Sequence, residues 1–189
     1  GLKFGYHNHS MEFAIVPGTS LTFEDFLIQN TDPDKVFFQM DVYWITVGGM
    51  DPVTYLKKYP DRFSVLHIKD DYVIGESGKI DYKAIFKQFY KNGHKDWFVE
   101  MEAKMTDEQR KQSIAMMEMM KQRMSGAQQG PPQGAPQGQA GQRQGPPQGQ
   151  QAGAGFGQRP QQSQADMLKE SLEGIRLSAE YLKNAKFVK

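Results

Sequence analysis

Side chains that can bind a metal ion recur at the ends of four short apolar segments. Each segment is rich in aromatic and β-branched residues, as expected for a buried β-strand. The segments, with the polar residues near their ends, are 2–9 with His7 and His9, 36–44 with Asp41, 63–70 with His67 and Lys69, and 96–102 with Glu100 and Glu102. A lone histidine in a strand is usually a hydrogen-bonded core residue, but four such endings indicate one shared site.

The spacing within each segment places the polar residues on one face of the predicted strand. Side chains two positions apart in a strand point to the same side, as His67 and Lys69 would. The predicted inward set is His7, His9, Gln39, Asp41, Tyr43, His67, Lys69, Glu100 and Glu102. The predicted outward set, which suits packing under helices, is Tyr6, Met40, Val42, Leu66, Ile68, Val99 and Met101.

Helical segments are predicted between these strands. Ser20 or Thr22 can cap a helix over 23–28, and Asp51 and Asp81 precede the next two helices. Strands that alternate with helices form βα units and a parallel sheet. We therefore expect an α/β fold with about four βα units, in which the carboxyl ends of the strands meet at one rim.

The chain divides into four parts by composition. The βα part, 1–104, is followed by a methionine-rich helix (105–124), a Gly/Pro/Gln-rich insertion (125–164) and a last covering helix (165–189). The insertion has no aliphatic residue larger than alanine, so we expect it to be disordered. The methionines of 105–124 fit either soft core packing or a binding surface.

The overall composition excludes several classes of function. The net charge is +1, which provides no field for holding nucleic acid or an anionic membrane. The chain has no cysteine, which excludes thiolate metal ligands, and no apolar run approaches the length of a membrane span. Because the chain opens on Gly1 directly before a strand, we expect its natural N-terminus to be missing, which leaves a cytoplasmic or a periplasmic location open.

The donor atoms at the predicted rim suit a divalent cation. Aspartate, histidine and glutamate together supply nitrogen and oxygen ligands, and no thiolate is present. Such a set fits Mn²⁺, Mg²⁺, Co²⁺ or Zn²⁺. The alternative is a hydrogen-bonded network that holds no metal.

Five motifs resemble the sugar phosphate isomerase/epimerase family of the xylose-isomerase-like TIM barrel superfamily, which also holds inosose dehydratases, ketose 3-epimerases and endonuclease IV. The motifs are 6–13 (YHNHSMEF), 41–44 (DVYW), 66–70 (LHIKD), 78–82 (GKIDY) and 99–102 (VEME). No single motif is strongly specific, whereas their order and spacing together are. The resemblance implies a (β/α)8 TIM-barrel type fold, of which this chain would hold the second half, strands five to eight.

The resemblance also implies a particular set of metal ligands. In the epimerases of this superfamily, Glu, Asp, His and Glu from strands five to eight hold one divalent metal. Three residues of this chain match the last three ligands by position, while the first ligand departs from the pattern. The matching residues are Asp41, His67 and Glu100, and the open position falls on His7, His9 or Glu12, of which we take His7.

The activity that this implies is metal-dependent isomerisation or epimerisation of a sugar or polyol, by proton transfer next to a carbonyl through an enediolate. Glu100 is expected to bridge metal and substrate, and His9, Glu12 or Glu102 to act as the base. Lys69 is expected to bind a hydroxyl or an anionic group. Loss of a β-hydroxyl or a glycosidic oxygen would instead give a dehydratase or lyase acting on a keto-sugar or inosose.

Further hypotheses concern other functions. Endonuclease-IV-like hydrolysis needs a cluster of zinc ions and a basic face, and the 4 histidines and the net charge of +1 argue against it. A non-catalytic interaction protein would work through the Gly/Pro/Gln tract and the methionine-rich helix. Trp44 stands where ketose epimerases have a substrate-binding histidine, which argues against ketose 3-epimerisation itself.

Four βα units make half of a barrel and leave two open sheet edges. A full barrel needs about 250 residues. We therefore expect an N-terminal half-barrel elsewhere in the same full-length chain, or a homo-oligomer that completes the sheet. As a fragment alone, this chain is expected to be inactive.

Overall fold

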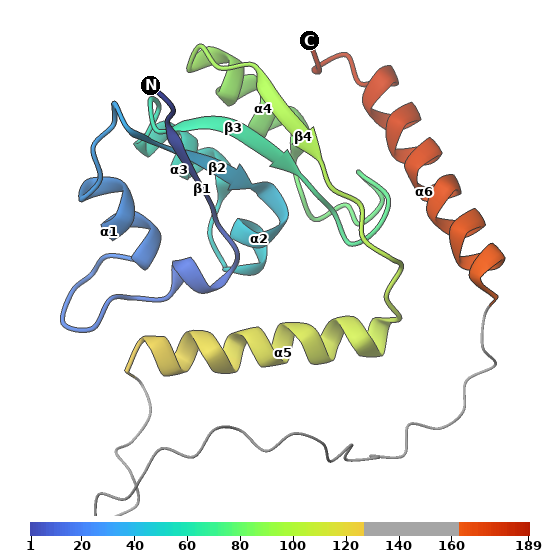
Figure 1. Ribbon diagram of the computed structural model, residues 1–189, viewed down its shortest axis with the longest axis horizontal. Coiled ribbons are helices and arrows are strands. Elements are labelled where there is room, and N and C mark those ends of the chain that lie inside the picture. The colour runs from blue at the N-terminus through green and yellow to red at the C-terminus, as the bar shows by residue number, and fades with distance from the viewer. Residues whose placement is uncertain (127–162) are drawn as a thin grey trace, which may run out of the picture.

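The computed structural model describes residues 1–126 and 163–189 of the chain. Figure 1 shows a twisted sheet with helices on one side, a long helix across one end and a second long helix beside the last strand. The insertion predicted to be disordered, 125–164, lies outside the described residues except at its two edges.

Four parallel strands form a single sheet with the spatial order β1-β2-β3-β4. The strands are β1 (Phe4–His7), β2 (Val36–Asp41), β3 (Phe63–Ile68) and β4 (Asp96–Val99). The connecting helices are α1 (Phe23–Gln29), α2 (Val42–Val47), α3 (Pro52–Lys58) and α4 (Tyr82–Lys91). Successive βα units with a parallel sheet make this an α/β fold that is consistent with part of a TIM barrel, as predicted.

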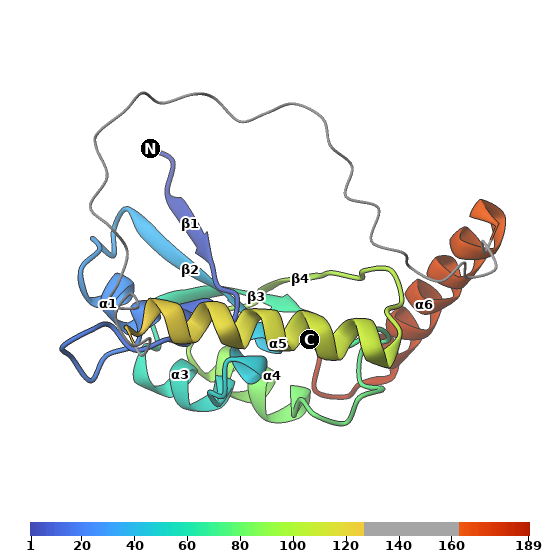
Figure 2. The ribbon, with the colours of Figure 1, turned by 90° about the horizontal axis from the view of Figure 1, so that it is seen from below.

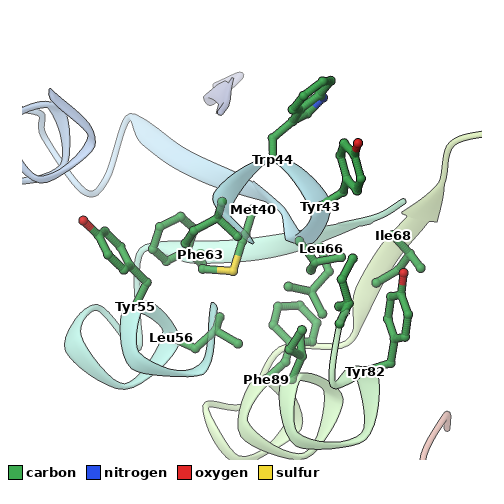
Figure 3. Close-up of a cluster of buried hydrophobic side chains, with 14 of the residues drawn as sticks. Met40, Tyr43, Trp44, Tyr55, Leu56, Phe63, Leu66, Ile68, Tyr82 and Phe89 are labelled. Carbon is green, nitrogen blue, oxygen red and sulfur yellow. The ribbon is translucent and has the colours of Figure 1, made fainter. Parts of the chain in front are cut away.

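One face of the sheet is covered by helices and forms the core. Helices α3 and α4 lie side by side beneath it (Figure 2). Met40, Leu66 and Ile68, which were predicted to point outward, are fully buried there, and Figure 3 shows them above side chains of α3 and α4. Val99 was predicted to pack in the same way but is 41% exposed, because α6 stands away from β4 and leaves a hollow beside it.

The predicted strand 36–44 is too long, which is a correction to the sequence prediction. β2 ends at Asp41, and α2 begins at the next residue. Val42 and Tyr43 therefore lie in a helix, and the alternation of a strand does not apply to them. The run Val-Tyr-Trp favours a strand by composition, but the side chain of Asp41 caps this helix and overrides that preference.

The starts of the other helices follow the predicted caps. Thr22, rather than Ser20, caps α1 and forms a capping box with Asp25. Asp51 and Asp81 cap α3 and α4 through their carboxylates. A short 3-10 helix, η1 (Met11–Phe13), lies within the loop between β1 and α1.

Two long helices come after the last strand. Helix α5 (Asp107–Met124) runs across the carboxyl ends of the strands (Figure 1). Helix α6 (Gln164–Asn184) contacts the loop after β3, where the backbone N–H of Ile74 donates to Ser178 Oγ at 3.0 Å. Within the two described ranges, none of the helices has the length and apolar character that a bilayer crossing requires.

A buried carboxyl group in α1 lacks a partner. Glu24 is 0% exposed, and neither of its side-chain oxygens has a hydrogen-bond partner among the described residues. Burial, with smaller contributions from the charges of Glu12 and Asp25, raises the pKa of Glu24 from 4.5 to about 8. The folded chain therefore binds this proton more tightly than the unfolded chain does, so Glu24 makes folding less favourable as the pH rises from 4.5 to about 8.

We expect Glu24→Met to stabilise the chain above pH 4.5, because the wild-type carboxylate is ionised in the unfolded chain and must take up a proton when folding buries it. The gain in the free energy of unfolding should grow by at most about 1.4 kcal/mol per pH unit between the two pKa values. Glu108→Met is the matched control, because Glu108 is exposed at the same position of α5, which also begins with a capping box. Urea unfolding at several pH values measures both variants; a gain that does not depend on pH would contradict the burial of an ionisable Glu24.

Candidate metal centre

Three neighbouring strands bring one potential ligand each to the same edge of the sheet. His7 is the last residue of β1, Asp41 is the last residue of β2, and His67 lies one position before the end of β3. Asp41 and His67 are direct partners in the β2–β3 register. Parallel strands end at one edge, and potential ligand atoms of the three side chains lie within 4.8 Å of one another.

The two carboxylate oxygens of Asp41 have different surroundings. Oδ1 accepts hydrogen bonds from the backbone N–H groups of Tyr43 (2.9 Å) and Trp44 (2.8 Å). These two hydrogen bonds cap the N-terminus of α2. Oδ2 is buried and has no hydrogen-bond partner among the described residues. It lies 3.6 Å from His7 Nε2 and 3.8 Å from His67 Nδ1. A buried oxygen without a donor, facing two imidazoles, has the position of a metal ligand.

Burial suppresses charge on these three groups. Burial raises the pKa of Asp41 to about 7, although the N–H group of Trp44 acts in the opposite direction. Burial and the neighbouring His67 lower the pKa of His7 to about 4, and burial also lowers the pKa of His67. Neutral imidazoles keep a lone pair for a cation, and a cation would favour the ionised form of Asp41.

The two imidazoles also contact each other. Their Nδ1 atoms are 3.1 Å apart, so one ring donates its N–H to the nitrogen of the other. His67 Nε2 lies 3.0 Å from Glu100 Oε2, on the far side of the ring from Asp41. A carboxylate in that position fixes the tautomer of a ligating histidine.

Glu100 therefore joins the centre through His67. It comes directly after the end of β4, is 38% exposed at its side chain, and lies outside the group of three ligands. Lys69 Nζ contacts Glu100 Oε1 at 2.8 Å and Glu102 Oε1 at 3.0 Å. Partial burial favours a raised pKa for Glu100, but the hydrogen bond and the charge of Lys69 outweigh it and hold this pKa below its usual range.

Lys69 is itself deeply buried, with 3% of its side chain exposed. Its ammonium group lies 5.8 Å from the ring of Tyr43 and 5.9 Å from the ring of Trp44. Both rings come from α2, so the cap of Asp41 also determines where they stand. The structure thus brings Lys69, Glu100 and Glu102 together as one charged cluster next to the histidines.

His9 and Glu12 occupy the loop after β1. The His9 ring lies against the His7 ring, with 5.1 Å between centroids, and 5.8 Å from Trp44. Glu12 accepts hydrogen bonds from the backbone N–H of His9 and from the hydroxyl of Tyr6, each at 2.9 Å. Glu12 therefore holds the loop that carries His9, and it lies outside the three-ligand group.

Two features of the centre were not predicted from the sequence. Asn8 is buried and joins the loop after β1 to the end of β2: its Oδ1 accepts from Asp41 N at 3.0 Å, and its Nδ2 donates to Asp41 O at 3.4 Å. The capping role of Asp41 was also missed, although an aspartate at the end of a strand is a common helix N-cap and was a usable signal.

Helix α5 contacts the loops that come after three of the strands. Ser10 Oγ donates to Met117 Sδ at 3.5 Å, and Lys121 Nζ donates to the carbonyl oxygen of Gly48 at 2.6 Å. Near the other end of the helix, Arg110 Nη1 lies 3.4 Å from Asp71 Oδ2. These loops follow β1, β2 with α2, and β3, so α5 crosses the edge of the sheet at which the three ligands lie (Figure 2).

Known proteins with similar sequences and structures give a consistent picture. An inosose dehydratase from Lacticaseibacillus casei is 27% identical over 123 residues, covering 52% of this chain and 40% of that protein. Two crystal structures of sugar phosphate isomerase/epimerases from Parabacteroides distasonis ATCC 8503 superpose with TM-scores of 0.60 and 0.61 at 33% and 29% identity. They cover 98% and 100% of this chain, but only 47% and 49% of the solved chains.

The chain thus spans about 40% of the length of the curated relative from Lacticaseibacillus casei. Residues 1–123 match the family described as the xylose isomerase-like TIM barrel, which is well over half of the 189 residues. The resemblance inferred from the five sequence motifs is confirmed. This chain belongs to the xylose isomerase-like TIM barrel family.

Proposed function

We propose that this chain binds one divalent metal ion through His7, Asp41 and His67, and that the ion serves proton transfer next to the carbonyl of a sugar or polyol. The observation that carries the proposal is the buried, unpartnered Oδ2 of Asp41 that faces two imidazoles within 3.8 Å. Two imidazoles and a carboxylate are the usual donors for Zn²⁺, Mn²⁺ or Co²⁺, whereas Mg²⁺ prefers oxygen alone.

Such an ion would act as a Lewis acid that polarises the carbonyl and stabilises the negative charge of an enediolate. The residues of this chain would orient the metal ligands and bind the substrate. Lys69 keeps Glu100 ionised next to His67, so we assign Glu100 to orienting this ligand, in place of the bridging role that the family resemblance implies. The same lysine is proposed to bind a hydroxyl or an anionic group of the substrate, which would have to compete with Glu100 and Glu102 for its buried ammonium group.

The proton carrier is proposed among the groups around the three ligands. His9 is exposed and stands beside His7, and Glu102 is 48% exposed and held by Lys69. Both can reach solvent and exchange a proton with it. Glu12, the third candidate, has both oxygens engaged by Tyr6 and the His9 backbone, so we assign it to positioning His9.

The fate of the enediolate decides which reaction is completed. Return of a proton to either of its carbons gives an isomerase or epimerase, which is the function named for the two solved relatives. Loss of a β-hydroxyl from the same intermediate gives a dehydratase, and the curated relatives named inosose dehydratase favour this second candidate. Both reactions use the same metal ligands and the same first step.

We expect Asp41→Asn and His67→Ala to lose divalent metal binding, since each removes one of three ligands. Isothermal titration with Zn²⁺, Mn²⁺ and Co²⁺ should show affinities that are lower by more than about tenfold. His94→Ala is the matched control, because His94 Nε2 donates to the carbonyl oxygen of Pro60 and lies outside the ligand group. Unchanged occupancy in both ligand variants would end the metal hypothesis.

Substitutions in the metal-free protein can distinguish the roles of the two Asp41 oxygens. Asparagine keeps an oxygen that caps α2, whereas alanine removes it, so Asp41→Ala should be less stable than Asp41→Asn by about 1 kcal/mol. Asp51, which caps α3 away from the centre, should show the same difference between Asp51→Ala and Asp51→Asn. Thermal or urea unfolding measures the four variants; equal stability of the two Asp41 variants would contradict the capping role.

Exchange of carbon-bound hydrogen with solvent tests the chemistry. In D₂O with Mn²⁺ or Co²⁺, this chain completed by the expected N-terminal half-barrel should introduce deuterium next to the carbonyl of an inosose or ketose, and Asp41→Asn should not. Proton NMR also distinguishes the two candidates, because an isomerase or epimerase keeps every hydroxyl and a dehydratase releases one as water. Deuterium incorporation that persists in Asp41→Asn would contradict catalysis at this centre.

A further inference from the structure

Four of the five methionines at the end of helix α5 lie outside the core. Positions 116 to 124 contain five of the 11 methionines in the chain, yet no residue of α5 is buried. Met116, Met119, Met120 and Met124 are between 38% and 56% exposed. Met117 packs in part against the core, but core packing, which is the usual explanation of a methionine-rich helix, does not account for the four exposed methionines.

Some of these methionines gather around a cavity at the carboxyl edge of the sheet. The cavity has a volume of about 240 Å³. Three methionines on one side of α5 form one wall, because positions three and four apart share a helix face. The loop after β1 forms the other wall. The lining residues are Ser113, Met116, Met117 and Met120 from α5, and His9, Ser10 and Met11 from the loop.

The donor atoms around this cavity are soft and carry no formal negative charge. Four thioethers and one imidazole line it, and no carboxylate, lysine or arginine is among the described residues that do so. Thioether ligands select Cu(I), whereas Mg²⁺, Ca²⁺ and Mn²⁺ require oxygen. A monovalent soft ion also needs less compensating charge than a divalent ion does. This cavity thus offers mainly soft, uncharged sulfur donors, whereas the centre at Asp41 offers a carboxylate and two imidazoles.

Contacts outside the cavity hold its two walls together. Glu12 fixes the loop wall through the N–H of His9 at 2.9 Å. Lys121, bonded to the carbonyl oxygen of Gly48, and Arg110, paired with Asp71, hold α5. Ser10 Oγ donates directly to Met117 Sδ at 3.5 Å, which shows that this sulfur faces the loop. The two walls are therefore positioned before any ligand arrives, although Met117 and Ser10 are 107 residues apart.

We propose that this cavity is a binding site for one soft monovalent cation, Cu(I) or its analogue Ag(I). The thioethers of Met11, Met116, Met117 and Met120 are the principal ligands, and the His9 imidazole is an additional donor. The ion binds in its monovalent state, and no electron transfer is involved. The site uses none of the three divalent ligands, so it stands or falls independently of the proposed function.

Ag(I) is the first probe, because it is redox-inert and the chain has no cysteine to compete for it. In the full chain labelled with ¹³C at the methionine methyl groups, one equivalent of Ag(I) should shift the signals of Met11, Met116, Met117 and Met120. The signals of Met119 and Met124, which lie on the same helix but do not line the cavity, should stay in place. Equal shifts of all exposed methionines would overturn the proposal.

Affinity for Cu(I) is the second measurement, made without oxygen in competition with bicinchoninate. Met117→Leu with Met120→Leu removes two sulfurs at nearly constant volume, and Met119→Leu with Met124→Leu is the matched control. The first pair should weaken Cu(I) binding by more than about tenfold and the control pair should not. Circular dichroism confirms that both fold.

The same titration on Asp41→Asn separates this site from the divalent centre, because that variant should bind Cu(I) as the wild type does. No Cu(I) binding by the wild type, or equal losses in the two methionine pairs, would show an apolar surface only and overturn the proposal. Loss of Cu(I) binding in Asp41→Asn would move the ion to the histidine cluster and equally contradict it.

Discussion

The carboxylate of Asp41 connects a helix start with the histidine cluster. Its Oδ1 accepts two backbone N–H groups of α2, so the side chain is fixed by the helix, and its Oδ2 is left facing His7 and His67. The helix N-terminus favours negative charge on this group, whereas burial raises its pKa to about 7. The two influences shift the pKa of Asp41 in opposite directions, and a cation bound at Oδ2 would favour the ionised form.

His67 joins this buried cluster to the charged one around Lys69. Its Nε2 faces Glu100 and its Nδ1 faces Asp41. If Nε2–H donates to Glu100, then Nδ1 is the acceptor of the N–H of His7 in the metal-free chain, and a cation on the side of Asp41 would replace that proton at the same lone pair. Glu100, which Lys69 keeps ionised, therefore acts on the centre through the tautomer of His67. This arrangement differs from direct ligation by Glu100, the fourth ligand that the family resemblance implies, and it holds the buried charge of Lys69 next to the centre.

The sequence predicts the strand ends better than the helices and loops beyond them. Period-two spacing within apolar runs was enough to place His7, Asp41 and His67 on one edge. The start of α2 was missed because Val-Tyr-Trp favours a strand, and only the Asp41 cap decides otherwise. The engagement of Glu12 by Tyr6 depends on the folded shape of the loop after β1. The position of α5 depends on contacts such as that of Lys121 with Gly48, 73 residues apart, which local pattern does not contain.

Helix α5 contacts the loops that follow the strands carrying the three candidate ligands. Its partners Ser10, Gly48 and Asp71 come after the strands that carry His7, Asp41 and His67. No residue of α5 is fully buried, so polar contacts and the partial packing of Met117 against the core hold it in place. A helix attached in this way can differ in sequence without cost to the sheet. Three of its methionines line the cavity beside His9, whose ring also contacts His7, so His9 lies between the thioethers and the cluster at Asp41.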